Sequence, residues 1–287
     1  MEYIFVGHSS FYMREGWLKK GVEYIKKYPQ ENAFSKSNIE AIDRLGIGSV
    51  MVQSLKFWMT TLDVMKKDKK RYILKREIEK ILEKDPYLQN TNILWLLHMY
   101  IMEREEKDQK SLLWEIILRS KKINVFTIEQ VENQLNLFLK ENNLSFSKRS
   151  IKDSITTFIK TYYTDESGED PENNMYSPFV RLDYLKKERE KEYIFRNISS
   201  EEISEYIPYY LLCRRSNNIN KNEMDMNDFY EEFNSIIRMK YYEYEKLISK
   251  LQNRNLISVD RAAGLSNIII IKKLDESEII GRLLESE

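Results

Sequence analysis

The chain has 287 residues, 42% of them hydrophobic, which is enough to fill a sizeable core in two domains or in one elongated helical body. Its 46 Lys and Arg balance 46 Asp and Glu, which argues against a protein that coats nucleic acid with its whole surface. The chain has 32% charged residues but only eight Gly and five Pro, which favours helices over a barrel or sandwich. Its single cysteine excludes an intrachain disulfide framework.

A Gly-His pair near the start marks the first candidate site. The pattern FxGHxxFxxRxxWLxK predicts a short extended segment that enters a helix on which Phe11, Arg14 and Leu18 share one face. His8 just ahead of a helix start, with Arg14 one turn into the helix, predicts a small anion site for a phosphate. The alternative is structural: both side chains tie the segment to the core by hydrogen bonds.

Two helices separated by a glycine turn are predicted over residues 39–62. Apolar residues recur at spacings of three from residue 39 to residue 45, and Gly46 then allows the backbone to turn sharply. We expect Ser49 to cap a second helix, whose apolar stripe comprises Met51, Leu55, Trp58, Met59 and Leu62. A helix, a turn and a helix followed by a hairpin is the order of a winged helix-turn-helix.

The second helix carries the predicted DNA-reading face. Gln53, Lys56 and Thr60 fall off the apolar stripe, and in a recognition helix such residues face the groove. Gln can pair in two-pronged fashion with an adenine edge, and Lys can reach guanine or phosphate. Together with Ser49 at the start of the helix, these residues are the expected DNA contacts.

A basic hairpin follows as the predicted wing. Its cations surround a single Asp68: Lys66, Lys67, Lys69, Lys70 and Arg71. Residues 1–84 contain 17 Lys and Arg against 11 Asp and Glu, an excess of six, so a local basic face is expected on a neutral chain. The alternative is a winged unit that binds protein, with the Lys-rich turn simply solvated.

An apolar helix is predicted from Ile93 to Arg104, after a turn at Asp85-Pro86. We interpret His98 within it as a hydrogen-bonded core histidine, because its neighbours supply neither a metal ligand nor a nucleophile.

Further helices are predicted over 111–120, 127–141 and 148–163. Thr127 is the expected cap of one, and Ser147 or Ser150 of another. The last two helices form a candidate second helix-turn-helix, although no clear wing follows it.

An acidic stretch then predicts an exposed linker or loop. It contains Asp165, Glu166, Glu169, Asp170 and Glu172 without the alternation or terminal Glu of a calcium loop, so we expect no metal there. Later in the chain, an amphipathic helix leads to a turn at 253–255 and to strands over 256–260 and 267–272 around Gly264, which suggests another wing. The carboxylate pairs Asp225 with Asp228 and Glu231 with Glu232 are interpreted as surface charge.

The predicted fold is therefore mainly α with small β-hairpins, built from winged helix-turn-helix units joined by helices. The expected divisions are a winged domain over 1–108, a helical domain over 109–164, an acidic linker over 165–180 and a winged-helix-like domain over 181–287.

Common catalytic and targeting motifs are absent. The sequence contains no GxxxxGK[ST], GxGxxG, GxSxG or HExxH, so it identifies no nucleotide or other cofactor. Two His and one Cys leave no Cys/His zinc cluster, although an all-carboxylate metal site stays open. Nucleases often use scattered carboxylates and a Lys that leave no short motif. Without a signal peptide or a run of about eighteen apolar residues, we expect a cytoplasmic protein that does not span a membrane.

Three segments in order, FVGHSSFYMREGWLKKG, LGIGSVMVQSLKFWM and LEKDPYLQNTNILWLLHMYI, resemble a bacterial domain-of-unknown-function family. The family includes the B component of Ssp-type DNA phosphorothioation systems, in which sulfur replaces a non-bridging phosphate oxygen as part of defence against phage. The resemblance covers about residues 3–104. The chain departs from the family pattern at Ser49-Val50, where the family has Lys-Asn, and at Gln89-Asn90, where it has Glu-Asp.

The resemblance implies a component that binds double-stranded DNA and partners a cysteine desulfurase, an ATPase and a sulfur-transfer enzyme. It carries over no catalytic residues. One alternative is a DNA nickase of that system that depends on Mg or Mn. Another is a transcriptional regulator or a protein-binding winged-helix scaffold.

Overall fold

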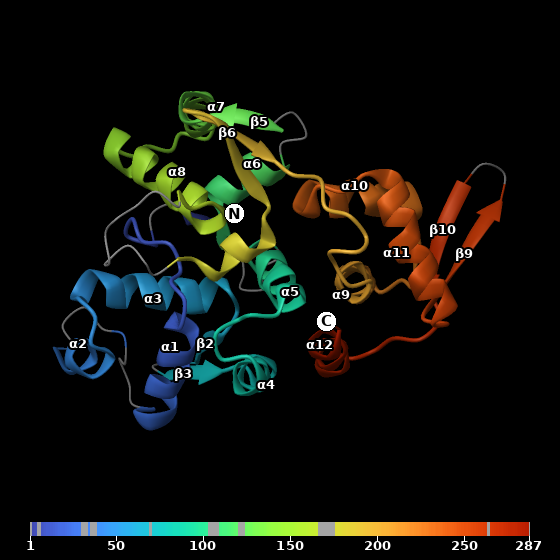
Figure 1. Ribbon diagram of the computed structural model, residues 1–287, viewed down its shortest axis with the longest axis horizontal. Coiled ribbons are helices and arrows are strands. Elements are labelled where there is room, and N and C mark those ends of the chain that lie inside the picture. The colour runs from blue at the N-terminus through green and yellow to red at the C-terminus, as the bar shows by residue number, and fades with distance from the viewer. Residues whose placement is uncertain are drawn as a thin grey trace. The chain divides into compact units, whose positions relative to one another are not determined.

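The computed structural model describes residues 2–4, 7–29, 34, 39–68, 71–102, 109–119, 124–165, 176–262 and 265–286. Helices predominate over these residues and the sheets between them are small (Figure 1), which confirms a mainly α fold with small β-hairpins. The chain divides into two compact units: unit 1 contains 1–89 and 97–195, and unit 2 contains 90–96 and 196–287. No helix in these described ranges is both long and apolar enough to cross a bilayer.

The first part of unit 1 contains a helix pair followed by a hairpin. Its elements are β1 (Glu2–Ile4), α1 (Trp17–Lys27), α2 (Ile39–Leu45), α3 (Ser49–Thr61), β2 (Met65–Asp68), β3 (Arg71–Leu74) and α4 (Arg76–Lys84). The chain turns between α2 and α3 at Gly46, where φ is +61°, a value that glycine adopts at little cost. The predicted helix, turn, helix and hairpin over residues 39–74 are thus confirmed.

A glycine of α1 leaves room for a side chain of α3. Gly21 of α1 faces α3, and a Cβ at that position would lie 2.2 Å from the Met59 sulfur. Leu55, Trp58 and Met59 are completely buried, so the apolar stripe of α3 packs into the core. The absence of a side chain at position 21 therefore makes room for the Met59 side chain.

The second part of unit 1 combines helices with a three-stranded sheet. The elements are α5 (Thr91–Met102), whose first residues belong to unit 2, β4 (Gln109–Ser111), α6 (Leu112–Arg119), β5 (Val125–Thr127), α7 (Ile128–Glu141), α8 (Lys148–Tyr162), the 3-10 helix η2 (Pro178–Leu182), β6 (Leu185–Arg189) and β7 (Glu192–Phe195). Strand β4 lies parallel to β1, and the antiparallel sheet has the order β5-β7-β6. Thr127 caps α7 through a capping box with Gln130, and Ser147 caps α8, as predicted.

His98 lies in the core of unit 1, as predicted. It is completely buried, and its Nδ1 lies 2.7 Å from the Tyr162 hydroxyl. The Trp114 indole donates to the same hydroxyl at 3.0 Å. Aromatic rings surround this cluster, and the Tyr184 ring meets the His98 ring edge to face.

Unit 2 repeats the order of the second part of unit 1. Its elements are α9 (Tyr206–Ile219), β8 (Glu223–Asp225), α10 (Met226–Ile237), α11 (Tyr241–Asn253), β9 (Ile257–Ala262), β10 (Leu265–Ile270) and α12 (Glu276–Glu285). In α9 to β10, as in α6 to β7, a helix and a short strand precede two helices and a hairpin, and the short strand pairs with the last strand of the hairpin. The predicted helix and strands of this region are confirmed, while Gly264 lies outside the described residues.

The carboxylate pairs of unit 2 have structural partners. Asp225 caps α10 by accepting from the backbone N–H groups of Asn227 and Asp228, and Glu232 forms an ion pair with Arg215. Both contacts fit the interpretation of these acids as ordinary charge.

Candidate nucleic-acid interface

The β2–β3 hairpin projects basic side chains from a buried base. Met65 at the start of β2 is 1% exposed, whereas Lys66 and Lys67 on β2 and Arg71 on β3 are exposed. Asp68 pairs with Arg71 in the register of the hairpin. Lys69 and Lys70, the predicted tip, lie outside the described residues. The described part of the hairpin thus presents more positive than negative charge to solvent.

An ion pair fixes the foot of the hairpin. The Lys75 ammonium pairs with the Asp63 carboxylate, and both side chains are largely buried. The backbone N–H of Lys75 donates to the Val64 carbonyl at 2.9 Å, which ties the chain leaving β3 to the chain entering β2. The direction of the hairpin is therefore fixed by contacts at its base.

The outer face of α3 is partly engaged within unit 1. Gln53 donates through Nε2 to the Phe34 carbonyl at 3.0 Å, and the Lys56 ammonium lies 5.6 Å from the centre of the Tyr72 ring. The Thr60 hydroxyl donates to the backbone carbonyl of Lys56 at 2.8 Å. These three side chains of α3 are therefore half-buried and have neighbours of their own.

The prediction that Ser49 caps α3 was wrong. Gly48 holds the N-cap position in an extended conformation, and its carbonyl already accepts the first helical bond, from Val52 at 2.9 Å. Ser49 is the first helical residue and is exposed. Because the glycine occupies the cap, the serine hydroxyl is left at the surface.

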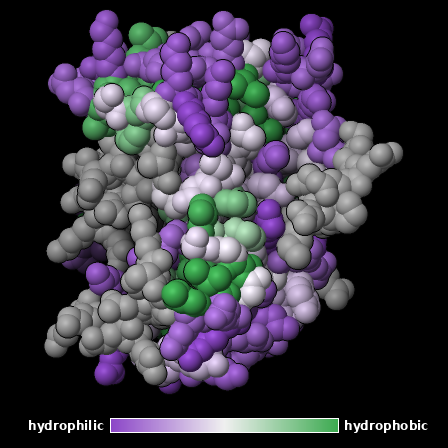
Figure 2. All heavy atoms as spheres, turned by 90° about the vertical axis from the view of Figure 1, so that its left-hand side faces the viewer, coloured by the Kyte–Doolittle hydropathy of each residue, from purple (hydrophilic) through white to green (hydrophobic). Residues whose placement is uncertain are grey.

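Two apolar side chains of the helix pair α2 and α3 are exposed. Ile39 is 71% exposed and Val50 is 52% exposed, at the first turns of the two helices. Figure 2 shows a face of the molecule on which a group of hydrophobic side chains lies among hydrophilic ones. Exposed apolar surface of this kind is the observation that favours the protein-binding alternative for this region.

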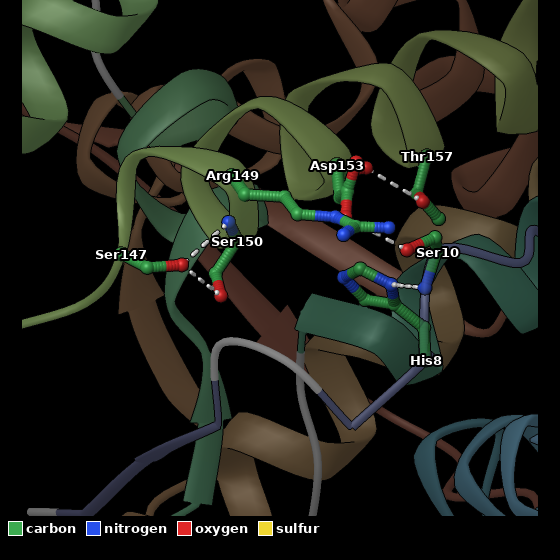
Figure 3. A network of polar contacts seen from close by, with 7 residues as sticks. All are labelled: His8, Ser10, Ser147, Arg149, Ser150, Asp153 and Thr157. Carbon is green, nitrogen blue, oxygen red and sulfur yellow. Dashed lines mark hydrogen bonds and ion pairs between the residues drawn. The ribbon is translucent and has the colours of Figure 1, made fainter.

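The Gly-His segment forms a turn that meets α8 (Figure 3). His8 is 3% exposed, accepts through Nδ1 from the Ser10 backbone N–H at 3.2 Å, and meets the Phe57 ring edge to face. The Ser10 hydroxyl donates to Asp153 on α8 at 3.1 Å, and Arg149 lies 3.8 Å from the same carboxylate. These contacts are structural, and the phosphate site at His8 stays a prediction.

The helical placement of Phe11 and Arg14 was wrong. The segment has no regular structure before α1 begins at Trp17, since Ser9, Ser10 and Gly16 all have positive φ. The Arg14 guanidinium instead lies 5.6 Å from the Phe11 ring centre and 5.9 Å from that of Trp17. The Phe11 carbonyl accepts from the Trp58 indole at 3.0 Å, so the segment is bound directly to α3.

The second predicted helix-turn-helix is followed by a hairpin that was not predicted from the sequence. Strands β6 and β7 form an antiparallel hairpin that pairs with β5 just ahead of α7. The hairpin lies in unit 1, although the expected boundary at residue 181 assigned it to the C-terminal domain. Residues 186–192 are all charged and carry no apolar pattern, so the clearest sign of the hairpin was the run Tyr193 to Phe195.

Helix α8 presents a basic face to solvent. Its exposed residues recur at helical spacing: Lys148, Arg149, Lys152, Thr156 and Lys160. The opposite face is buried and includes Ile151, Ile155 and Phe158. Unlike the outward side chains of α3, these cations remain accessible.

The acidic residues after α8 are mostly beyond the described ranges. Glu166, Glu169, Asp170 and Glu172 lie outside them, and Asp165 forms an ion pair with Lys187 at 2.9 Å. Among the residues that the structure describes, no group of three or more His, Cys, Asp or Glu side chains is arranged to hold a metal ion.

Comparison with known proteins relates the whole chain to one family. The family model described as "Protein of unknown function (DUF4007)" matches residues 5–284. A crystal structure of magnesium ion-bound SspB and another crystal structure of SspB share the fold. Each has a TM-score of 0.80 and 18% sequence identity, and each match covers 99% of this chain and 88% of the other. A comparison with curated proteins found no match. The family resemblance drawn from the three sequence segments is thus confirmed.

Proposed function

The chain belongs to the DUF4007 family, and from this premise we propose that it is a cytoplasmic DNA-binding component of a bacterial DNA phosphorothioate modification and antiphage defence system. The observation that supports this most is the likeness to SspB, which extends over 99% of the chain. On this proposal its partners are duplex DNA and the cysteine desulfurase, ATPase and sulfur-transfer enzyme of the same system.

We propose that the DNA-binding architecture consists of winged helix-turn-helix units. The order of helices and hairpins is that of the motif in α2 to β3, in α6 to β7 and in α9 to β10. In the last two, a short strand ahead of the helix pair joins the hairpin in a three-stranded sheet. Such units place one helix where it can meet a groove and a hairpin where it can meet the neighbouring backbone.

In the first unit, the hairpin is the proposed phosphate contact. Lys66, Lys67 and Arg71 are exposed on a hairpin whose base is fixed, and cations so placed release counterions from DNA. The side chains of Gln53 and Lys56 are partly engaged, so we assign them a secondary role in base contact. Binding by this unit is therefore expected to depend more on salt than on sequence.

A salt series with duplex DNA tests the proposal. Replacing Lys66, Lys67 and Arg71 by Ala should weaken binding about equally across sequences. It should also reduce the slope of log affinity against log salt by up to about 2.7, since each phosphate contact contributes roughly 0.9. A control variant with Ala at the exposed Lys140, Lys221 and Lys272 should keep the slope. An unchanged slope in the hairpin variant would reject the assignment.

A metal-dependent DNA nickase is the second candidate function. It is favoured by the magnesium ion bound to SspB, a protein of the same fold. Incubation of supercoiled plasmid with Mg²⁺ or Mn²⁺ tests it, and plasmid that stays uncut by a verified folded protein would count against it.

A further inference from the structure

A cavity of about 260 Å³ lies in unit 1, on the side of α8 that carries its exposed cations. It is formed by the second half of α8, the start of α7, strand β7 and the segments around residues 12, 163–165 and 176–177. Four tyrosines line it, together with Lys160 and Thr156 of α8: Tyr12, Tyr163, Tyr176 and Tyr193. A cavity of this size is large enough for one flat heterocycle.

The four tyrosine rings keep part of their surface exposed to solvent. None of the four is buried, and Tyr176 is 39% exposed. The rings of Tyr163 and Tyr193 meet edge to face with their centres 5.9 Å apart, so they form two perpendicular walls. Tyr193 is held from behind by stacking on the buried Phe126, at 5.8 Å between ring centres. The walls are therefore positioned before any ligand enters.

Polar groups at the rim add hydrogen-bonding capacity. The Tyr163 hydroxyl donates to Asp165 at 3.3 Å, and that carboxylate also accepts from Lys187 at 2.9 Å. Burial raises the pKa of the Tyr163 and Tyr193 hydroxyls, so both stay protonated at neutral pH. The hydrogen bond from Lys187 lowers the pKa of the Asp165 carboxyl, which therefore accepts hydrogen bonds. The rim thus offers both donors and an acceptor.

The exposed face of α8 leads toward this cavity. Arg149 and Lys152 precede Thr156 and Lys160 at spacings of three and four, so all lie on one side of the helix. The distance along the axis from residue 149 to residue 160 is roughly 16 Å at 1.5 Å per residue. A row of cations that ends at a group of aromatic rings is the combination by which proteins hold unpaired nucleic acid: the cations follow phosphates and the rings stack on bases.

We propose that this cavity receives the base of an unpaired nucleotide, which the tyrosine rings stack on while the α8 cations hold adjacent phosphates. The inference rests on the proposed function in taking the ligand to be nucleic acid, but it concerns a surface separate from the β2–β3 hairpin. A free mononucleotide offers the same base and phosphate chemistry as a nucleotide in a strand. Displacement by thymidine monophosphate distinguishes these two sources.

The test measures fluorescence anisotropy of a labelled twelve-nucleotide thymidine strand and of an abasic strand of the same length. Tyr163→Ala should weaken binding of the thymidine strand roughly 5- to 150-fold, because stacking on one aromatic side chain contributes about 1–3 kcal/mol per base. Tyr163→Phe keeps the ring and should stay within about twofold of the wild type. Tyr87→Ala is the matched control, since Tyr87 is 48% exposed in unit 1 and does not line the cavity.

The abasic strand should bind more weakly and be insensitive to Tyr163→Ala, because it offers phosphates without bases. Tyr163→Ala and Tyr87→Ala could weaken binding of the thymidine strand equally while the hairpin substitutions still reduce the salt slope of duplex binding. That result would overturn the cavity proposal alone. If the hairpin substitutions do not change the salt slope, the hairpin assignment is rejected instead. If thymidine monophosphate displaces the thymidine strand, the site binds a base and its ligand is a free nucleotide. If binding of the strand requires Tyr163 but thymidine monophosphate does not displace it, the ligand is a nucleotide within a strand.

Discussion

The Tyr162 hydroxyl stabilises unit 1, and Tyr162→Phe measures by how much. The side chain is 1% exposed, and its oxygen accepts from the Trp114 indole at 3.0 Å and lies 2.7 Å from His98 Nδ1. Burial raises the pKa of this hydroxyl well above its ordinary value, so it keeps its proton. It can therefore accept from the Trp114 indole and donate to Nδ1 of His98.

The substitution removes one oxygen and keeps the ring, so the cost comes from lost hydrogen bonds with little change in packing. A buried donor deprived of its acceptor costs about 1–3 kcal/mol, and the loss of the histidine contact adds about 0.5–1.5 kcal/mol. We expect the free energy of unfolding to fall by about 1.5–4.5 kcal/mol in total. For a domain of this size that corresponds to a fall in Tm of roughly 3–18 °C.

Guanidinium denaturation followed by circular dichroism and tryptophan fluorescence measures the change. Tyr163→Phe is the matched control, because it removes the hydroxyl of the next residue, which donates at 3.3 Å to the exposed Asp165 carboxylate. Its cost should stay below about 0.5 kcal/mol. If Tyr162→Phe costs no more than the control, the buried hydroxyl does not satisfy its neighbours and the reasoning is refuted.

Three further substitutions test other parts of the chain. Gly21→Ala should lower the free energy of unfolding by about 1–3 kcal/mol, because it forces a Cβ against Met59. In a double-mutant cycle with Met59→Ala, the double variant should lose less stability than the two single variants lose together. Additive losses would contradict the contact. The hydrogen bond from Arg196 lowers the pKa of Glu202 from 4.5 to about 2, so its stabilisation is present above pH 4.5 and lost as pH falls toward 2. Between pH 4.5 and 2, the stability of the Glu202→Gln variant should accordingly fall less steeply than that of the wild type. An unchanged profile would exclude the Arg196–Glu202 pair as a cause of the loss of stability in acid. Gln53→Ala should alter sequence preference in a selection from random duplexes, and an unaltered preference would exclude a base contact by this residue.

The sequence predicted those elements whose pattern is local. The helix pair over residues 39–62 and the hairpin after it follow from apolar spacing, a glycine at positive φ and a cluster of lysines. The Thr127 capping box was found for the same reason, since the motif lies within four consecutive residues. The burial of His98 followed from a strongly apolar helix.

Predictions failed where a backbone conformation or a distant partner decides the structure. The N-terminal pattern had helical spacing, but left-handed backbone at Ser9, Ser10 and Gly16 keeps the segment out of a helix until Trp17. Propensity gives no warning of this, because the segment is held by hydrogen bonds from Ser54 and Trp58 on α3 to the Phe11 carbonyl.

The β6–β7 hairpin was missed for a related reason. Its partner, β5, lies on the far side of α7 and α8 in the sequence, so the sheet is completed only by tertiary contact. The tyrosine cavity is likewise assembled from residues 12, 156–165, 176 and 193, and no local pattern joins them. The elements of the interface can therefore be predicted from local patterns, whereas the surface that their packing creates depends on tertiary contacts.

The two helix–hairpin units of unit 1 differ in whether the cations of their second helix are accessible to solvent. We therefore expect the two units to bind different forms of nucleic acid. The outward side chains of α3 bind within the unit, so its exposed cations are those of the hairpin. The cations of α8 remain exposed along the helix, while the following hairpin mixes Lys and Glu and carries little net charge. The salt dependence of duplex binding should therefore be governed by the β2–β3 hairpin, and the binding of unpaired bases by α8 and its cavity. Variants of one surface should leave the other response intact, and a variant that changed both equally would argue for a single continuous site.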